Sequence, residues 1–103
     1  ATGQAKVRLS TGVALAQTLP EGTAVLFHVD YEFVQGQPLP DSSQPQYFWV
    51  IEPGRGPAGK IPVKLRAKGE QETISPWKPE DGPFRTHFED ASGRKISDSI
   101  DLR

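Results

Sequence analysis

Residues 23–34 read T-A-V-L-F-H-V-D-Y-E-F-V, and their apolar side chains recur at every second position. The apolar members of this set are Val25, Phe27, Val29, Tyr31 and Phe33. His28, Asp30 and Glu32 lie between them. Successive side chains of an extended chain point to opposite faces. The pattern therefore predicts a long β-strand with one face in a core and the other near water, whereas a helix would scatter the apolar residues around its circumference.

Glycine and proline separate the other apolar stretches of the chain. The 103 residues include ten of each, which is above the average combined usage of about 12%. Their even spread is typical of turns between many short strands, and it predicts an all-β protein. This length supports one modest hydrophobic core, so we expect residues 1–103 to form a single domain.

The remaining strands are expected where short apolar patterns stand between turn residues. Leu19-Pro20-Glu21-Gly22 predicts a tight turn before the strand that contains Val25, and Gly12 predicts a kink or bulge in the strand before it. Pro62 cannot donate a hydrogen bond within a sheet, so its strand is expected at a sheet edge. These further strands are predicted at residues 5–9, 47–51, 60–67, 71–74, 84–89 and 96–102, with a helix over 95–102 as the alternative to the last.

Two features of this pattern resemble the immunoglobulin-like or fibronectin-III-like β-sandwich. Trp49 stands in the third main strand, where that fold keeps a core tryptophan. The segment D-G-P-F-R-T, residues 81–86, is similar to the entry to its sixth strand, with Phe84 in place of Tyr and Thr86 in place of Cys. The resemblance implies an antiparallel sandwich of about seven or eight strands. Its expected core consists of Val25, Phe27, Val29, Tyr31, Trp49, Ile51, Val63, Leu65, Phe84 and Phe88.

Composition excludes several classes of function. A net charge of -1 argues against a general nucleic-acid binder, and no apolar run reaches the roughly 20 residues of a membrane-spanning helix. The chain has no Cys, so disulfides and thiolate catalysis are excluded. It also has no Met and begins with Ala1, which we interpret as a processed form or a fragment of a longer protein. Together with the fold resemblance, this favours an extracytoplasmic or secreted location.

His28, Asp30 and Glu32 are the weak metal candidates of the sequence. They would share one face of one strand, but alternate residues of a strand lie about 6.5–7 Å apart. That spacing is too wide for three ligands at about 2 Å from one ion unless other strands help. His87 is expected to face outward on a different sheet. We therefore predict a solvated polar face and no cofactor, with metal binding or acid–base chemistry as the alternative.

Aromatic and basic side chains provide the candidate ligand-binding residues. The chain offers Trp77 as an exposed contact or, alternatively, as a plug over the open end of the core. Tyr31 and Tyr47 to Trp49 are expected mainly in the core. Arg55, Lys64 and Arg66 belong to a basic run that also includes Lys60 and Lys68, which could attract an acidic polysaccharide or protein, although protection of a sheet edge explains it more simply.

No catalytic signature organises the serine, histidine and aspartate residues. The G-x-G-x-x-G motif of Gly54 to Gly59 precedes a predicted strand instead of a helix, so we interpret it as a hairpin loop. We predict a non-catalytic binding or spacer module with a protein or polysaccharide partner. A carbohydrate-binding module is the alternative, and a small metal-dependent enzyme is the third possibility.

Overall fold

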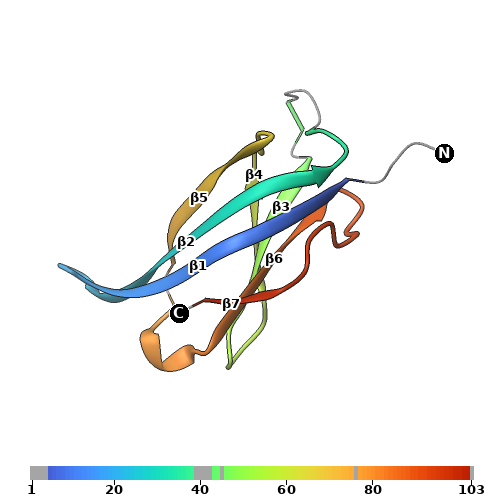
Figure 1. Cartoon of the computed structure of the whole chain (residues 1–103). Coiled ribbons are helices and arrows are strands. Elements are labelled where there is room, and N and C mark those ends of the chain that lie inside the picture. The colour runs from blue at the N-terminus through green and yellow to red at the C-terminus, as the bar shows by residue number, and fades with distance from the viewer. Residues whose placement is uncertain (1–4, 39–42, 45, 76, 103) are drawn as a thin grey trace.

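The computed structural model describes residues 5–38, 43, 44, 46–75 and 77–102. These residues form two antiparallel sheets that enclose the core as a β-sandwich (Figure 1). One sheet has the order β1-β2-β5, and its strands are β1 (Lys6–Leu19), β2 (Gly22–Gln35) and β5 (Lys68–Ser75). The other has the order β4-β3-β6-β7, and its strands are β4 (Gly59–Val63), β3 (Tyr47–Glu52), β6 (Phe84–Asp90) and β7 (Ile100–Leu102).

The described residues contain no α-helix, and the only helical turn among them is the 3-10 turn η1 (Pro79–Asp81). None of them forms a helix with the length and apolar character that crossing a membrane requires. The prediction of an all-β sandwich with seven or eight strands is therefore confirmed, with seven strands described.

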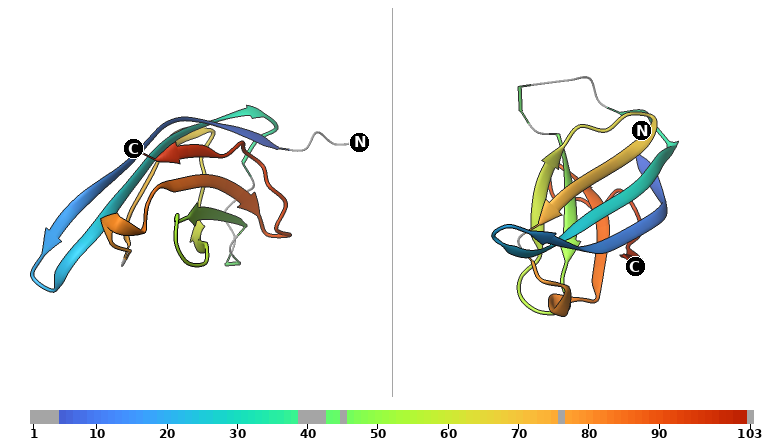
Figure 2. Two further views of the ribbon diagram at one scale, coloured as in Figure 1. Left: turned by 90° about the horizontal axis from the view of Figure 1, so that it is seen from below. Right: turned by 90° about the vertical axis from the view of Figure 1, so that its left-hand side faces the viewer.

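The β1–β2 hairpin is the longest feature of the fold. Leu19 pairs with Gly22, whose φ of 135° lies in the region that favours glycine, so the predicted turn at Pro20 and Glu21 is confirmed. The expected bulge is present as a register shift between Leu9 and Thr11, slightly before Gly12. Since β5 pairs with β2 only from Glu32 to Val25, the tip of the hairpin projects beyond the rest of the sheet (Figure 2).

The core lies between the sheets and contains the alternating residues of β2. Phe27 and Val29 are fully buried, and Phe27 contacts the Phe84 ring edge-on with a centroid distance of 4.9 Å. Among the predicted core residues Val63 is only partly buried, and the others are buried. Phe33, the last apolar residue of the alternation, is also partly buried. Aromatic burial on this scale compensates for the missing disulfide, because large rings contribute most to the stability of a small core.

Thr86 joins β3 and β6 at the position where the resemblance would place a cysteine. Its side chain is fully buried. The Trp49 indole N–H donates a hydrogen bond to the Thr86 hydroxyl, which donates in turn to the Val50 carbonyl oxygen at 2.8 Å. A buried hydroxyl with both a donor and an acceptor partner avoids the cost of an unpaired polar group. These hydrogen bonds connect β3 and β6 within one sheet, whereas the disulfide of the resembled fold would connect β2 and β6 across the two sheets.

Three predicted strands have different bounds in the structure. The strand expected at 60–67 ends at Val63, after which the chain crosses to the other sheet, although its edge position is confirmed. The expected 71–74 strand extends to Lys68–Ser75. At the C-terminus only Ile100–Leu102 is a strand, and 95–99 make isolated bridges at Lys95 and Ser97 instead of the alternative helix.

Candidate functional site

The solvent face of the β1-β2-β5 sheet carries two neighbouring groups of side chains. Val25 and Phe27 point into the core, so the residues between and after them point outward. Strand register aligns these residues across the sheet. The first group, which we name the apolar row, consists of Leu15, Leu26 and Ile74. The second, the His28 cluster, consists of His28, Asp30, Glu70 and Glu72.

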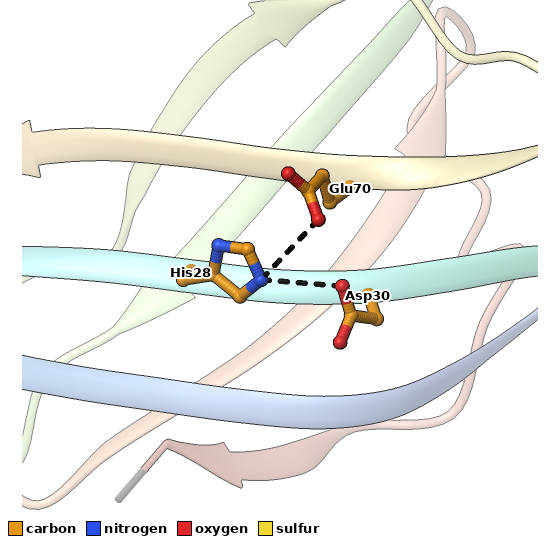
Figure 3. A group of neighbouring side chains, drawn as sticks. All are labelled: His28, Asp30 and Glu70. Atoms are coloured by element: carbon orange, nitrogen blue, oxygen red, sulfur yellow. Dashed lines mark hydrogen bonds and ion pairs between the residues drawn. The ribbon is translucent and has the colours of Figure 1, made fainter.

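The His28 cluster forms because β5 brings two carboxylates beside β2. Glu72 is the register partner of His28, and Glu70 is the partner of Asp30. The Nε2 atom of His28 lies 3.2 Å from Asp30 Oδ1 and 3.8 Å from Glu70 Oε2 (Figure 3). Its Nδ1 atom lies 3.2 Å from Glu72 Oε2. Both imidazole nitrogens therefore face carboxylates, and three acidic groups surround one ring.

The carboxylates of the cluster favour the protonated form of His28. Burial by itself would lower the pKa of His28, because desolvation penalises the charged imidazolium. The hydrogen bonds that His28 donates to Glu72 and Asp30, together with the charges of Asp30 and Glu70, outweigh burial and raise the pKa above its ordinary value of 6.5. The carboxylates gather more negative charge than one protonated ring neutralises.

Glu32 does not join the cluster that the sequence suggested for it. Its carboxylate instead pairs with Arg8 at 3.0 Å, farther along the sheet. Glu70 takes the third place that we expected Glu32 to fill. The alternation of Glu70, Glu72 and Ile74 was the available signal in the sequence, but local sequence does not say which strand lies beside β2.

His87 belongs to a second group of charged residues, on the outer face of the β4-β3-β6-β7 sheet. Its Nε2 atom lies 2.8 Å from Glu89 Oε2, and the other Glu89 oxygen lies 2.9 Å from Lys60 Nζ. Nδ1 lies 3.3 Å from Glu52 Oε1 but makes no hydrogen bond. Strand alternation places His87 on the outer side as expected, yet only 8% of its side chain is exposed, so this position is not solvated.

Glu89 is the acidic centre of this second group. Burial by itself would raise its pKa, but the hydrogen bonds from His87 and Lys60, with their charges, hold the pKa below its ordinary value of 4.5. The Glu89 side chain is 13% exposed. Lys60 supplies a positive charge to this carboxylate, so Glu89 is the shared acceptor of an ion-pair network with Lys60 and His87.

The basic candidates do not form one row along a strand. Arg55 is exposed in the loop between β3 and β4. Lys64 and Arg66 follow the end of β4, where the Lys64 carbonyl accepts a hydrogen bond from Gln71 and the Arg66 backbone N–H donates to the Tyr31 hydroxyl. Lys60 pairs with Glu89. A role for Arg55, Lys64 and Arg66 in ligand binding stays a prediction.

Trp77 packs against the end of the core, in the position of the predicted plug. Its ring centroid lies 5.8 Å from that of Phe27 and 5.9 Å from that of Phe84. A Cβ atom added at Gly59 would lie 2.9 Å from the indole, so only glycine leaves room there. The side chain is partly buried, and the ring contributes to packing whether or not it also contacts a ligand.

No protein-family model, curated protein sequence or solved structure matches this chain.

Proposed function

We propose that this chain is a non-catalytic binding module that recognises a protein through the solvent face of the β1-β2-β5 sheet. We also propose that its connectivity is of the immunoglobulin-like or fibronectin-III-like type. Support for the connectivity comes from the strand orders β1-β2-β5 and β4-β3-β6-β7, and from the buried Trp49 on β3. One fold hosts many functions, so recognition depends on the residues that this sheet face presents.

The apolar row is the observation that carries the proposal. Leu15 is 50% exposed and Ile74 is 54% exposed. Both are register partners of Leu26, so the three side chains lie in one line across the sheet. Side chains that are directly opposite on adjacent strands have Cβ atoms about 4.5–5.5 Å apart, which makes the row a continuous apolar surface. Continuous exposed apolar surface rimmed by polar residues marks interaction sites.

The residues beside the row define the chemistry of the partner. On the outward side of β5, Glu72 comes directly before Ile74, and Glu70 comes before Glu72. Their side chains are 59% and 68% exposed, so both carboxylates face solvent. A complementary partner would place an apolar contact over the row and Lys or Arg side chains beside it, because opposite charges steer association and fix orientation.

The carbohydrate-binding alternative has weaker support. Stacking on sugars needs a flat, exposed aromatic ring, and Tyr31, Tyr47 and Trp49 are buried in the core. Trp77 uses its ring against Phe27 and Phe84. The apolar row offers aliphatic contacts, which suit a protein surface better than a sugar ring.

Selection from a displayed peptide library tests the proposed function. The purified chain serves as bait in a buffer with EDTA, and the double variant Leu15→Lys, Ile74→Lys serves for counter-selection. We expect enriched peptides to combine apolar residues with Lys or Arg, to bind the double variant at least tenfold more weakly, and to bind more weakly as salt rises. Charge complementarity predicts that salt dependence.

Val34→Lys is the matched control for this selection, because Val34 is 56% exposed on β2 but lies outside the row. Its binding of the peptides should equal that of the original chain. Enriched peptides that bind the double variant and the original chain equally would overturn the proposal. Self-association that disappears in the double variant, with no peptide enriched, would also overturn it, since a second copy would then occupy the face.

A further inference from the structure

We propose that the His28 cluster is a binding site for a zinc-type divalent cation, with His28, Asp30 and Glu70 as ligands. This inference goes beyond the proposed recognition of a protein and does not depend on it. It places a metal on the same sheet face, next to the apolar row, where the sequence alone predicted a solvated polar surface.

The distances between the ligand atoms fit one ion. Ligand atoms about 2.0–2.1 Å from a tetrahedral zinc ion lie about 3.3–3.4 Å from one another. His28 Nε2 is 3.2 Å from Asp30 Oδ1 and 3.8 Å from Glu70 Oε2, and the three ligand atoms lie within 4.8 Å of one another (Figure 3). The Glu70 side chain is 68% exposed, so its rotation can close the remaining difference.

Glu72 supplies a second, separate feature of metal sites. A histidine that binds a metal through one ring nitrogen usually donates its other N–H to a carboxylate, which fixes the tautomer and ring orientation. Glu72 Oε2 lies 3.2 Å from His28 Nδ1 and can accept that hydrogen bond. With the proton on Nδ1, the lone pair of Nε2 points toward Asp30 and Glu70. Glu72 is therefore a positioning residue and not a ligand.

The ligand set indicates which cation would bind. Calcium and magnesium prefer sites made entirely of oxygen atoms, whereas imidazole together with carboxylate suits zinc and its first-row neighbours. Three protein ligands leave one position of a tetrahedron for water. The face is exposed to solvent, with 39% of the Asp30 side chain accessible, so water can reach that position.

The neighbouring strands hold the ligands in place before an ion arrives. His28 and Asp30 lie on the central strand of the sheet, and β5 is hydrogen-bonded to that strand along Val25 to Glu32. The backbone positions of all three ligands are therefore fixed by strand pairing, and each ligand adjusts only through its side chain. A site built on paired strands loses less entropy on binding than one built on loops.

Calorimetric titration of the chelator-treated chain with zinc chloride tests the proposal. We expect saturable binding of one ion per chain, with no comparable binding of magnesium. His28→Ala should abolish it, and Asp30→Asn or Glu70→Gln should weaken it at least tenfold. Glu72→Gln should weaken it about 10- to 100-fold, the usual effect of losing a carboxylate that orients a ligand.

Glu32→Gln separates ligation from simple attraction. It removes the same charge from the same strand face, but Glu32 pairs with Arg8 outside the cluster, so zinc affinity should stay within about twofold. A second readout is the visible absorption of bound cobalt, which reports tetrahedral coordination and should disappear in His28→Ala. Circular dichroism checks that each variant is folded.

Three outcomes would overturn the metal site: no saturable zinc binding, unchanged affinity in His28→Ala, or equal losses in Glu32→Gln and Glu72→Gln. None of them bears on the peptide selection, which is carried out with EDTA. Failure of the metal site and failure of the recognition face are therefore distinguishable.

Discussion

The two histidines of the chain lie on the outer faces of opposite sheets, each among carboxylates, yet their surroundings differ. His28 has a side chain that is 23% exposed and carboxylate neighbours that face solvent. His87 is 8% exposed, and its partner Glu89 is shared with Lys60. Similar residue types thus form an open group with excess negative charge on one sheet and a closed ion-pair network on the other. The comparison indicates that the first is available to a ligand and the second supports the fold.

Packing around the two rings explains the difference. The register partners of His28 are Val13 on β1 and Glu72 on β5, and both of these strands are sheet edges. His87 pairs with Val50, which is only 2% exposed although it lies on the outer side of β3. The Glu89 carboxylate is only 13% exposed, so its interactions with His87 and Lys60 are screened less by water and salt than those of the exposed carboxylates around His28. The His87 network should therefore matter more for stability.

Removing each histidine is the strongest test of this comparison. We expect His87→Ala to lower the free energy of unfolding by about 2 kcal/mol or more, because it leaves a cavity and an acceptor on Glu89 without its partner. His28→Ala, in metal-free buffer, should change it by less than about 1 kcal/mol. Urea denaturation at neutral pH measures both. Equal losses in the two variants would contradict the assignment of one open and one structural group.

The pH dependence of stability gives a second test of the His87 group, because it reports on the ionisation of Glu89. Its pKa is lower in the folded chain than its ordinary value of 4.5, so its ionised form stabilises the fold above that pH. This stabilisation is lost as pH falls through the folded-state pKa. Glu89→Gln should cost about 1 kcal/mol at neutral pH and flatten the decline of stability as pH falls below the ordinary value of 4.5. Urea denaturation at each pH measures this decline. If the free energy of unfolding falls with pH equally in Glu89→Gln and the original chain, the ionised Glu89 does not stabilise the fold in this way.

The smallest effect on stability is expected for an exposed ion pair on the solvent face of the β1-β2-β5 sheet. Arg8 and Glu32 pair at 3.0 Å, but their side chains are 65% and 40% exposed. Arg8→Gln should change the free energy of unfolding by less than about 0.5 kcal/mol, because exposed ion pairs contribute little. Lys60→Gln, which removes the corresponding cation from the closed network, is the matched comparison. Thermal denaturation of both variants should rank Lys60→Gln as the more destabilising, and the opposite ranking would contradict the comparison.

Much of the fold could be predicted from local patterns. Alternation from Val25 to Phe33 identified the central strand and its buried face, and Pro62 identified an edge strand. These predictions succeed because side-chain periodicity and backbone donors are properties of the chain itself. The C-terminal bounds were less predictable, since the isolated bridge at Ser97 depends on Val7, near the other end of the chain.

The candidate site could be predicted only in part. The sequence identified His28 and Asp30 as metal-competent and correctly required help from another strand, but it offered Glu32 as the third ligand. The helping residues, Glu70 and Glu72, lie about 40 positions later, on a strand that the sequence indicated only weakly. Pairing of β2 with β5 is what brings them to His28.

By itself, the sequence determined the class of this protein: an all-β chain whose long central strand buries every second side chain. Period-two alternation and turn residues act over a few positions, so they can be recognised without coordinates. Only the tertiary structure decided which strands are neighbours, and with that which charges meet. It gathered Glu70 and Glu72 around His28, enclosed His87 with Glu89 and Lys60, and aligned Leu15, Leu26 and Ile74 across three strands. Strand order depends on contacts across the whole chain, which local patterns do not record.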